Sequence, residues 1–277
     1  MLRRLPDKPF FNFAISNLIS VKFSIFDIFL LKISRLGIGE NYKPGLVSVL
    51  IPTYNRKNIL FERAIKSVLN QTYQDFEVII VDDGSSDGTY DKLLEFNHPK
   101  IKVIKNSRTR YRYPNKAIYH WFTGGVSALN RGLKYCKGQY IARIDDDDIW
   151  TEDHIEKLLS FLVENQYEFV YSHLRAKMTA TGNEEIISNH PDPLGNTCTW
   201  FFKSYLKHFK LNIHCWRKKK NRVFDVDVHD RYFKAGVRIG YLKEVTAIYL
   251  PRPNEEFAGS KAYIANSEEI ELKHSKQ

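Results

Sequence analysis

The sequence predicts an α/β domain with a mostly parallel, doubly wound sheet. From residue 46 onward, short apolar runs alternate with segments whose apolar residues recur at helical spacing, and this alternation is typical of βαβ units. Polar or acidic clusters follow several of the apolar runs. Because ligands of such sheets bind at the carboxyl ends of strands, we expect the functional residues to gather at one edge of the sheet.

The elements follow one another in a regular order. Apolar runs predict strands at 47–51, 76–81, 101–104 and 140–144. Helical spacing predicts helices at 59–71, 88–95 and about 125–136. Three polar clusters follow the first, second and fourth strands: PTYNR (52–56), DDGSSDGT (82–89) and DDDD (145–148). These clusters are therefore expected to lie close together.

Composition limits the class of protein. A chain of 277 residues with 43% hydrophobic and 14% aromatic content can bury a sizeable core, so it is not a disordered protein. The formal charge of +10 indicates an anionic partner, such as nucleic acid, an anionic membrane surface or a phosphorylated substrate. The three cysteines are too few and too scattered for a disulfide framework and include no CxxC pair, so we expect a reducing, cytoplasmic setting.

Residues 1–45 differ from the rest of the chain and predict an amphipathic helical extension. Within 10–33, Phe, Ile and Leu dominate, and polar residues recur at helical spacing. These polar residues are Asn12, Ser16, Ser20, Ser24 and Asp27.

A transmembrane helix is not expected in this segment, because Lys22 and Asp27 would each cost about 2.5 to 3.5 kcal/mol near the centre of a membrane span. No small-residue cleavage site follows, so a signal peptide is not expected either. Two interpretations remain: a helix lying in a membrane interface, or a helix packed on the main domain.

The four consecutive aspartates at 145–148 carry an electrostatic cost. Two carboxylates about 4 Å apart repel by about 4 kcal/mol at an effective dielectric constant near 20, so four are tolerated only in water or around a cation. An isolated acidic run is usually a solvated turn. Here Ile144 precedes the run and Ile149 and Trp150 follow it, and such apolar neighbours favour a folded site.

Four motifs in this order resemble a known family. VSVLIPTYNR, AIKSVLNQTYQDFEVIIVDDGSSDGT, GGVSALNRGL and GQYIARIDDDDIW are similar to the ordered signatures of the family 2, GT-A fold, nucleotide-sugar glycosyltransferases. The resemblance covers residues 47 to about 165, with a weaker stretch near 224–250. It implies a GT-A domain at 46–256, with a nucleotide-binding half at 46–150 and an acceptor half at 151–256. A tail at 257–277 would follow.

The resemblance implies roles for the acidic run. Asp145 and Asp147 correspond to the family's DxD pair, and Asp147 is the best candidate to contact a metal ion and the donor diphosphate. Carboxylate oxygens suit Mn²⁺ or Mg²⁺. Asp146 or Asp148 would contact the ribose or orient the other groups. Alternatively, one of the four aspartates caps the helix that follows.

The resemblance also implies a donor nucleotide site at the first two polar clusters. Asp83 corresponds to the position that accepts a hydrogen bond from the nucleobase, with Asp82 as the adjacent alternative. Pro52, Thr53 and Tyr54 would line the same edge, against the base. The competing interpretation is turn chemistry, since Asp, Ser and Gly dominate loops.

An inverting transfer needs a base that accepts the proton of the acceptor hydroxyl. The family places an acidic pair at the start of a late helix that ends in glycine, and 223–236 is the matching segment. Counting back from Gly236 implies that Asp225 is the base, although Phe224 stands where the family has Glu. Other candidates for the base are Asp227, Asp230 and His229. An aspartate at a helix start is also often only an N-cap.

Two segments lie outside the family pattern. Residues 106–125 mix basic with aromatic side chains, and residues 215–222 form a basic run, CWRKKKNR. Either segment could contact sugars, phosphates or an anionic bilayer. The alternative for both is a solvated surface with some packed aromatic residues.

Together these residues predict an inverting, metal-dependent glycosyltransferase of surface polysaccharide synthesis. It would transfer a sugar from a nucleotide-diphosphate donor, a UDP-sugar, to a hydroxyl of a glycan or lipid-linked acceptor. We expect a cytoplasmic protein with peripheral contact at the cytoplasmic face of the inner membrane, and we do not expect nucleic acid as a partner. Two alternatives are a nucleotidyltransferase with a similar metal site and a noncatalytic module that binds anionic membranes or nucleic acid.

Overall fold

The computed structural model describes most of the chain. The described residues are 18, 23, 25–37, 41–106, 114, 117–179, 181–187, 197–218, 223–253 and 255–256. Several residues singled out above lie outside this set: Asn12, Ser16, Ser20, Lys22, Ser24 and the tail 257–277, together with parts of the segments 106–125 and 215–222.

The predicted nucleotide-binding half contains four strands that run parallel to one another. β1 (Lys43–Thr53) lies between β2 (Phe76–Asp82) and β4 (Gly138–Arg143), and both neighbours run parallel to it. β3 (Ile101–Lys105) pairs in parallel with the outer side of β2. The four strands predicted from the sequence are therefore confirmed, with β1 reaching further in both directions than its apolar run.

Beyond β4 the sheet is mixed. β8 (Phe201–Lys203) runs antiparallel between β4 and β6 (Phe169–Ala176), while β9 (Ile239–Tyr249) is parallel to β6. β5 (Ile149–Trp150) pairs with β9, and β7 (Glu185–Ile187) with β6, both antiparallel. A single sheet thus runs continuously through the predicted nucleotide-binding and acceptor halves.

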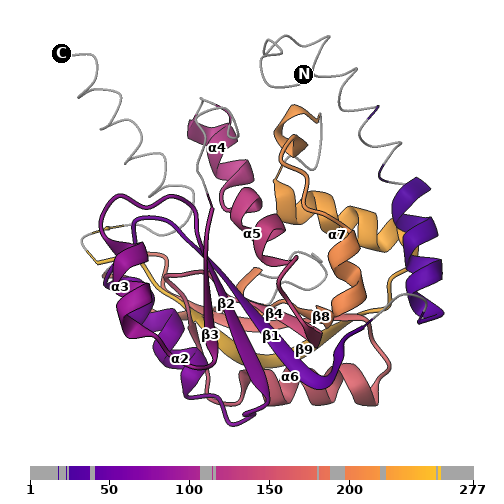
Figure 1. The fold of residues 1–277 in the computed structure, drawn as a ribbon, viewed down its shortest axis with the longest axis horizontal. Coiled ribbons are helices and arrows are strands. Elements are labelled where there is room, and N and C mark those ends of the chain that lie inside the picture. Colours follow the sequence, from indigo (N-terminus) through magenta and orange to yellow (C-terminus); the bar gives the residue numbers. More distant parts are fainter. Residues whose placement is uncertain are drawn as a thin grey trace.

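Helices cover both faces of this sheet (Figure 1). One face carries a π-helical segment (Phe61–Ile65) that continues into α2 (Lys66–Leu69), then α3 (Thr89–Phe96) and α6 (His154–Glu164). The other face carries α4 (Ala117–Thr123), α5 (Val126–Gly132) and α7 (Phe224–Ala235). Three short 3₁₀ segments complete the description: Thr197–Thr199, Ser204–His208 and Cys215–Arg217.

The core consists of two apolar layers, one on each side of β1. Val49 and Ile51 belong to the layer under α2 and α6, whereas Leu50 packs with Leu129 of α5 on the other side. Successive side chains of a strand point to opposite faces, and a strand covered on both faces reads as a continuous apolar run. The run VSVLI in β1 has this origin.

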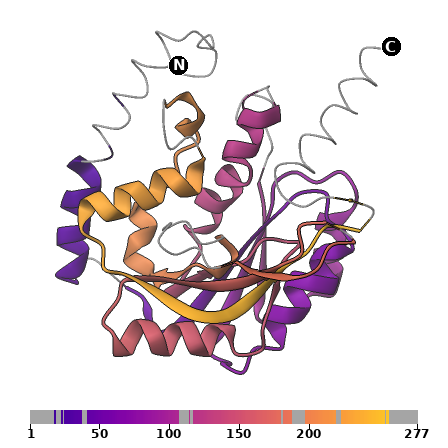
Figure 2. The ribbon, with the colours of Figure 1, turned by 180° about the vertical axis from the view of Figure 1, so that it is seen from behind.

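A helix at residues 25–35 packs on the main domain, beside α7 in both views (Figures 1 and 2). Its Asp27 is 2% exposed and forms an ion pair with Arg231 of α7. In its described part, residues 25–35, this segment is therefore a helix packed on the domain. Within the described ranges, no helix combines the length and apolar character that a membrane crossing requires.

Candidate functional site

The first two polar clusters meet at the carboxyl ends of β1 and β2. Pro52 and Thr53, predicted to follow β1, are its last two residues, and the carbonyl of Thr53 accepts a 2.8 Å hydrogen bond from the amide of Asp83. Beyond them, Asn55 donates from its amide to Ser85 Oγ (2.9 Å) and accepts at Oδ1 from the amide of Ser86 (2.8 Å). Asn55 has φ 53°, in the left-handed region that Asn tolerates. The two loops are thus held together.

Asp82 and Asp83 have different roles in this loop. Asp82 accepts hydrogen bonds at Oδ2 from the amides of Gly84 and Ser85, both at 3.1 Å, and so closes the turn. Asp83 is 3% exposed and accepts a 2.6 Å hydrogen bond from Nδ2 of Asn106 at the end of β3. Turn chemistry therefore accounts for Asp82, while Asn106 orients the carboxylate of Asp83. The sequence signal for Asn106 is a polar residue directly after a strand.

Three of the four consecutive aspartates each face a different arginine. The pairs are Asp145–Arg143 at 2.7 Å, Asp146–Arg56 at 3.8 Å and Asp147–Arg252 at 2.6 Å. These guanidinium groups offset the repulsion among the carboxylates. From the sequence, water or a metal cation was expected to offset the repulsion. The arginines were not anticipated, because only Arg143 is close to the run in sequence.

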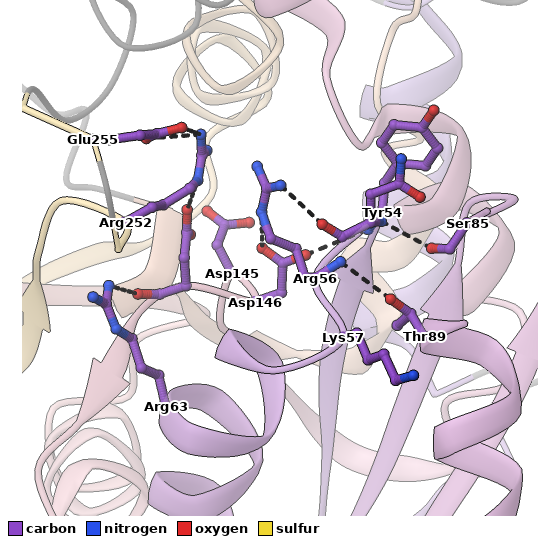
Figure 3. A network of polar contacts seen from close by, with 12 residues as sticks. Tyr54, Arg56, Lys57, Arg63, Ser85, Thr89, Asp145, Asp146, Arg252 and Glu255 are labelled. Atoms are coloured by element: carbon purple, nitrogen blue, oxygen red, sulfur yellow. Dashed lines mark hydrogen bonds and ion pairs between the residues drawn. The ribbon is translucent and has the colours of Figure 1, made fainter. Parts of the chain in front are cut away.

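The segment that follows β9 is tied to the acidic loop. Arg252 donates from Nε to Oδ2 of Asp147 and also faces Glu255, at 3.2 Å. Arg63 donates to the carbonyl of Asp147 (2.8 Å) and to the carbonyl of Pro251 (2.7 Å). Figure 3 shows Arg252 and Glu255 on one side of the loop and Tyr54 and Arg56 on the other. The acidic loop is therefore enclosed by residues from distant parts of the chain.

Tyr54 lies beside the acidic loop. Its amide is 3.4 Å from Oδ2 of Asp146, and its side chain is 37% exposed. The amide of Arg56 donates to Oγ1 of Thr89, at the start of α3, at 3.1 Å. This contact fixes the backbone from which the Arg56 side chain reaches Asp146.

Burial and mutual repulsion change the protonation of the acidic run. Burial, followed by repulsion from Asp147, raises the pKa of Asp146 to about 7, against the opposing effect of Arg56. Burial, followed by repulsion from Asp147 and Asp145, raises the pKa of Asp148 well above its usual value. Asp148 is 3% exposed, and its Oδ1 has no hydrogen-bond partner within the described part of the chain. A nearby cation would favour the ionised forms again.

The donor set fits a hard divalent cation that is shared with a substrate. Carboxylate oxygens are the ligands that Mg²⁺ and Mn²⁺ prefer. In the described ranges, no group of three or more His, Cys, Asp and Glu residues is arranged to hold a metal ion. Mg²⁺ is often bound by one or two carboxylates together with substrate phosphates; Asp145 and Asp147 are carboxylates of this kind, and in this structure they pair with Arg143 and Arg252. Asp147 would first have to release Arg252.

Asp225 lies in the first turn of α7, close enough to the acidic loop to interact with it electrostatically. Burial raises the pKa of its carboxyl group, Arg143 lowers it, and the charge of Asp145 raises it further. Arg143 also stacks over the ring of Phe224, 5.2 Å from its centroid. The side chain of Asp225 is half-buried and accepts a 2.7 Å hydrogen bond from the amide of Val226. The structure therefore brings this late acid to the side of the acidic run.

The other candidates on α7 are engaged elsewhere. Asp227 is fully buried and forms ion pairs with Lys218 (2.7 Å) and Arg231 (3.5 Å). Asp230 forms an ion pair within the same helix, and His229 is 3% exposed. Of these acids on α7, Asp225 is the half-buried one on the side of Arg143 and Asp145.

The two segments outside the family pattern pack against each other. Tyr119 of α4 stacks on Trp216, with ring centroids 5.0 Å apart, and the guanidinium of Arg217 lies 4.0 Å from the Trp216 ring centroid. Gly125, between α4 and α5, has φ 74°, and a side-chain carbon there would lie 3.8 Å from Pro52. The loop between α4 and α5 thus lies against the end of β1 at Pro52.

Comparisons with known proteins agree with this geometry. A family model, Glycosyl transferase family 2, matches residues 48–244. The UDP-Glc:alpha-D-GlcNAc-diphosphoundecaprenol beta-1,3-glucosyltransferase WfgD of Escherichia coli is 36% identical over 145 residues, covering 52% of this chain and 48% of that protein. The putative teichuronic acid biosynthesis glycosyltransferase TuaG of Bacillus subtilis is 36% identical over 132 residues, covering 48% and 47%. The chain thus spans about half the length of these relatives.

Solved structures share the fold. The structure of S. aureus TarS residues 1–349 in complex with UDP-GlcNAc superposes with a TM-score of 0.57 at 20% identity, covering 76% of this chain and 60% of that one. The mannosyltransferase PcManGT of Pyrobaculum calidifontis, in complex with GDP-Man and Mn²⁺, superposes with a TM-score of 0.55 at 17% identity, covering 88% and 70%. The GT-A fold expected from the sequence is confirmed by these similarities.

Proposed function

Because the chain belongs to glycosyl transferase family 2, we propose that it transfers a sugar, with inversion, from a UDP-sugar to a hydroxyl of a glycan or lipid-linked acceptor. The observation that carries this proposal is that the loops after β1, β2 and β4 are joined: the amide of Asp83 donates to the carbonyl of Thr53, and the amide of Tyr54 lies 3.4 Å from Asp146. Arg143, which pairs with Asp145, also lies over the ring of Phe224, the neighbour of Asp225. The proposed donor and acceptor follow those of relatives: the name of WfgD gives UDP-Glc and a diphosphoundecaprenol-linked acceptor, and TarS binds UDP-GlcNAc.

We place the donor nucleotide in the half formed by residues 46–150. Asp83, oriented by Asn106 at 2.6 Å, would accept a hydrogen bond from the base. Pro52, Thr53 and Tyr54 would line the same pocket edge. Asp146 would contact the ribose, since it lies beside the amide of Tyr54.

The diphosphate would lie over the acidic run. Asp145 and Asp147 would hold a divalent cation, Mn²⁺ or Mg²⁺, which when bound stabilises negative charge on the departing diphosphate. Arg252 stands within 2.6 Å of Asp147 and can turn to phosphate oxygens once that carboxylate is engaged. The chain therefore supplies both the carboxylates and a guanidinium group at the place where charge develops.

The base would come from the acceptor half, residues 151–256. Asp225 has a pKa raised by burial, and a carboxylate with a raised pKa accepts a proton more readily during attack. Its position in the first turn of α7, near Asp145, would direct it toward the reacting hydroxyl. Asp227, fixed by Lys218 and Arg231, would instead hold α7 in place.

For the whole protein we propose a role in bacterial surface polysaccharide synthesis at the cytoplasmic face of the membrane. TuaG is named for teichuronic acid biosynthesis and WfgD for a diphosphoundecaprenol-linked acceptor. The charge of +10 suits a substrate or surface that carries phosphates.

A thermal-shift screen of UDP, GDP, dTDP and their sugars, with and without Mn²⁺, tests the donor assignment. We expect stabilisation by UDP and a UDP-sugar that increases with Mn²⁺, because a ligand that binds the folded state raises the unfolding temperature. Stabilisation by GDP or dTDP but not by UDP would overturn the donor assignment.

Turnover is followed through the released product. The proposal requires a nucleoside diphosphate, whereas release of pyrophosphate from a nucleoside triphosphate would identify a nucleotidyltransferase. Asp147→Ala should abolish release, while Glu95→Ala, which removes an exposed carboxylate on α3, should not. An active Asp147→Ala enzyme would contradict the assignment of the acidic run.

A further inference from the structure

The helix at residues 25–35 turns its polar side toward the protein. Asp27 and Leu31 are each 2% exposed and Ser34 is 7% exposed, and their spacing places them on one face of the helix. A helix on the surface of a globular domain usually buries apolar residues and exposes polar ones. Here a charged residue and a hydroxyl group are part of the buried face.

Ion pairs attach this face firmly to the domain. Asp27 accepts two hydrogen bonds from Arg231 of α7, from Nε at 2.6 Å and from Nη2 at 2.9 Å. Arg35 donates from Nε and Nη2 to the two carboxylate oxygens of Glu168, at 2.8 and 2.6 Å. Bidentate pairs of this kind fix orientation as well as contact. The helix is therefore held near both of its ends.

The opposite face is apolar and exposed. We call it the outer face and define it by residues with large exposed fractions: Ile25 69%, Phe26 56%, Ile28 38%, Phe29 58% and Leu36 72%. Both ribbon views place this helix at the margin of the molecule with α7 on its inner side (Figures 1 and 2). Contiguous exposed apolar side chains of this kind mark an interaction surface.

We propose that the outer face docks onto an anionic lipid surface, with the helix lying in the plane of the interface. Its charge complements such a surface. Asp27 and Arg35 are engaged with the domain, so the exposed Lys32 supplies the charge of this side of the helix. The whole chain carries a formal charge of +10. Apolar side chains together with basic residues are what an interfacial helix uses to bind anionic bilayers.

In a free amphipathic helix, water contacts the polar side. Here the rest of the domain contacts that side instead. The polar side, which would otherwise face solvent, is satisfied by Arg231 and Glu168, and the apolar side remains available for lipid. The sequence left two interpretations of this segment, an interfacial helix or a helix packed on the domain. The structure makes them compatible, because packing uses one face and docking uses the other.

Docking would also orient the candidate site. Arg231, which holds Asp27, and Asp225, the proposed base, belong to the same helix α7. A surface bound to the outer face therefore has a fixed direction relative to Asp225. This consequence rests on the proposed function, since only a lipid-linked acceptor benefits from that orientation.

Vesicle sedimentation with the full-length protein tests the proposal. We expect the protein to sediment with vesicles of phosphatidylcholine and phosphatidylglycerol, and much less with phosphatidylcholine alone. The double variant Phe26→Ser/Phe29→Ser should lose binding by about tenfold or more, because it removes two aromatic groups from the interface. Val163→Ser, at a 52% exposed position of α6 on the other face of the sheet, is the matched control and should bind as the wild type does.

Other outcomes would overturn the assignment. Equal sedimentation of the double variant and the wild type excludes the outer face as the lipid contact. A wild-type dimer in solution that the double variant converts to a monomer, without vesicle binding by either, would assign the face to a second copy. Unchanged unfolding temperatures of the variants establish that folding is intact.

The donor thermal shift separates this proposal from the proposed function. Vesicle binding without any nucleotide-dependent shift would retain the docking surface and reject the proposed transfer from a UDP-sugar. A UDP-dependent shift without vesicle binding would support the proposed function and reject the docking surface.

Discussion

The carboxylate of Asp147 accepts a 2.6 Å hydrogen bond from Nε of Arg252, which follows β9 and lies 105 positions further along the chain. Arg63, whose side chain donates to the carbonyls of Asp147 and Pro251, also holds this segment against the acidic loop. The residue that we propose to bind a metal ion beside the diphosphate therefore already has a cationic partner. Any ligand of Asp147 must compete with that partner.

Replacing Arg252 should make the nucleotide-free protein a better metal binder. A hydrogen bond to a charged group contributes about 1.5 to 3 kcal/mol, so we expect Arg252→Gln to raise Mn²⁺ affinity by about tenfold or more, measured by calorimetry. Glu255→Gln is the matched control, because it removes a partner of Arg252 and leaves Asp147 paired. Unchanged Mn²⁺ affinity in Arg252→Gln would mean that Asp147 does not bind the ion.

Asp225 and Asp227 both lie in the first turn of α7. Replacing the first should affect catalysis, and replacing the second should affect stability. Asp225→Asn should reduce kcat by about 10² to 10⁴, the usual contribution of a general base, while leaving the UDP-dependent thermal shift intact. Asp227→Asn should instead lower the unfolding temperature, because Lys218 and Arg231 lose an anionic partner inside the protein. The reverse pattern would assign the base to Asp227.

The pH dependence of turnover provides a second test of Asp225. Burial raises its pKa, with Arg143 acting in the opposite direction, and a base works only when it is deprotonated. We therefore expect kcat to fall with decreasing pH at an apparent pKa above the ordinary aspartate value of about 3.9. This acidic limb should be absent from the residual activity of Asp225→Asn.

Replacing Asp83 should weaken nucleotide binding, whereas replacing Asp82 should lower the stability of the fold. Asp83→Ala removes the carboxylate that Asn106 orients, so UDP affinity should fall by roughly tenfold, the effect of one hydrogen bond to a charged group. Asp82→Ala removes the acceptor of the Gly84 and Ser85 amides and should lower the unfolding temperature. Equal UDP affinity of Asp83→Ala and wild type, measured by calorimetry, would reject the nucleobase assignment.

Glu168 should make stability depend on acid pH. Burial acts to raise its pKa, but hydrogen bonds from Arg35, the Arg238 amide and Tyr205 lower the pKa of this fully buried carboxylate to about 2, from 4.5. Since the folded pKa lies below the unfolded one, the stabilisation is present above about pH 4.5 and disappears as the pH falls toward about 2. We expect this linkage to amount to about 3 kcal/mol at most.

Denaturant unfolding of the wild type and Glu168→Gln between pH 6 and pH 2.5 measures this effect. The variant should be less stable at pH 6 and should lose less stability on acidification, because its amide does not titrate. Parallel pH profiles for the two proteins would show that Glu168 is not the group responsible.

Local sequence determined the first half of the fold. Strands such as VSVLI and FEVIIV are apolar because both of their faces are covered, so their residues report burial directly. Parallel strands place their carboxyl ends at one edge, and so the meeting of the Asn55 and Ser85 loops followed from the order of motifs. The family resemblance could also point to the acidic run from the sequence alone, because its four residues are consecutive.

Tertiary structure alone decided the partners of these residues. Arg252 follows β9 and Asn106 follows β3, the neighbour of β2, and no local pattern specifies which cation or amide meets which carboxylate. The short antiparallel strands β5, β7 and β8 also escaped prediction, because two or three residues carry little periodicity. Asp27 was visible in the sequence as part of a polar stripe, but the side to which it points was not. Arg231, at the other end of the chain, turns Asp27 inward and leaves the apolar side outward, because a buried charge needs a partner that only the folded domain supplies.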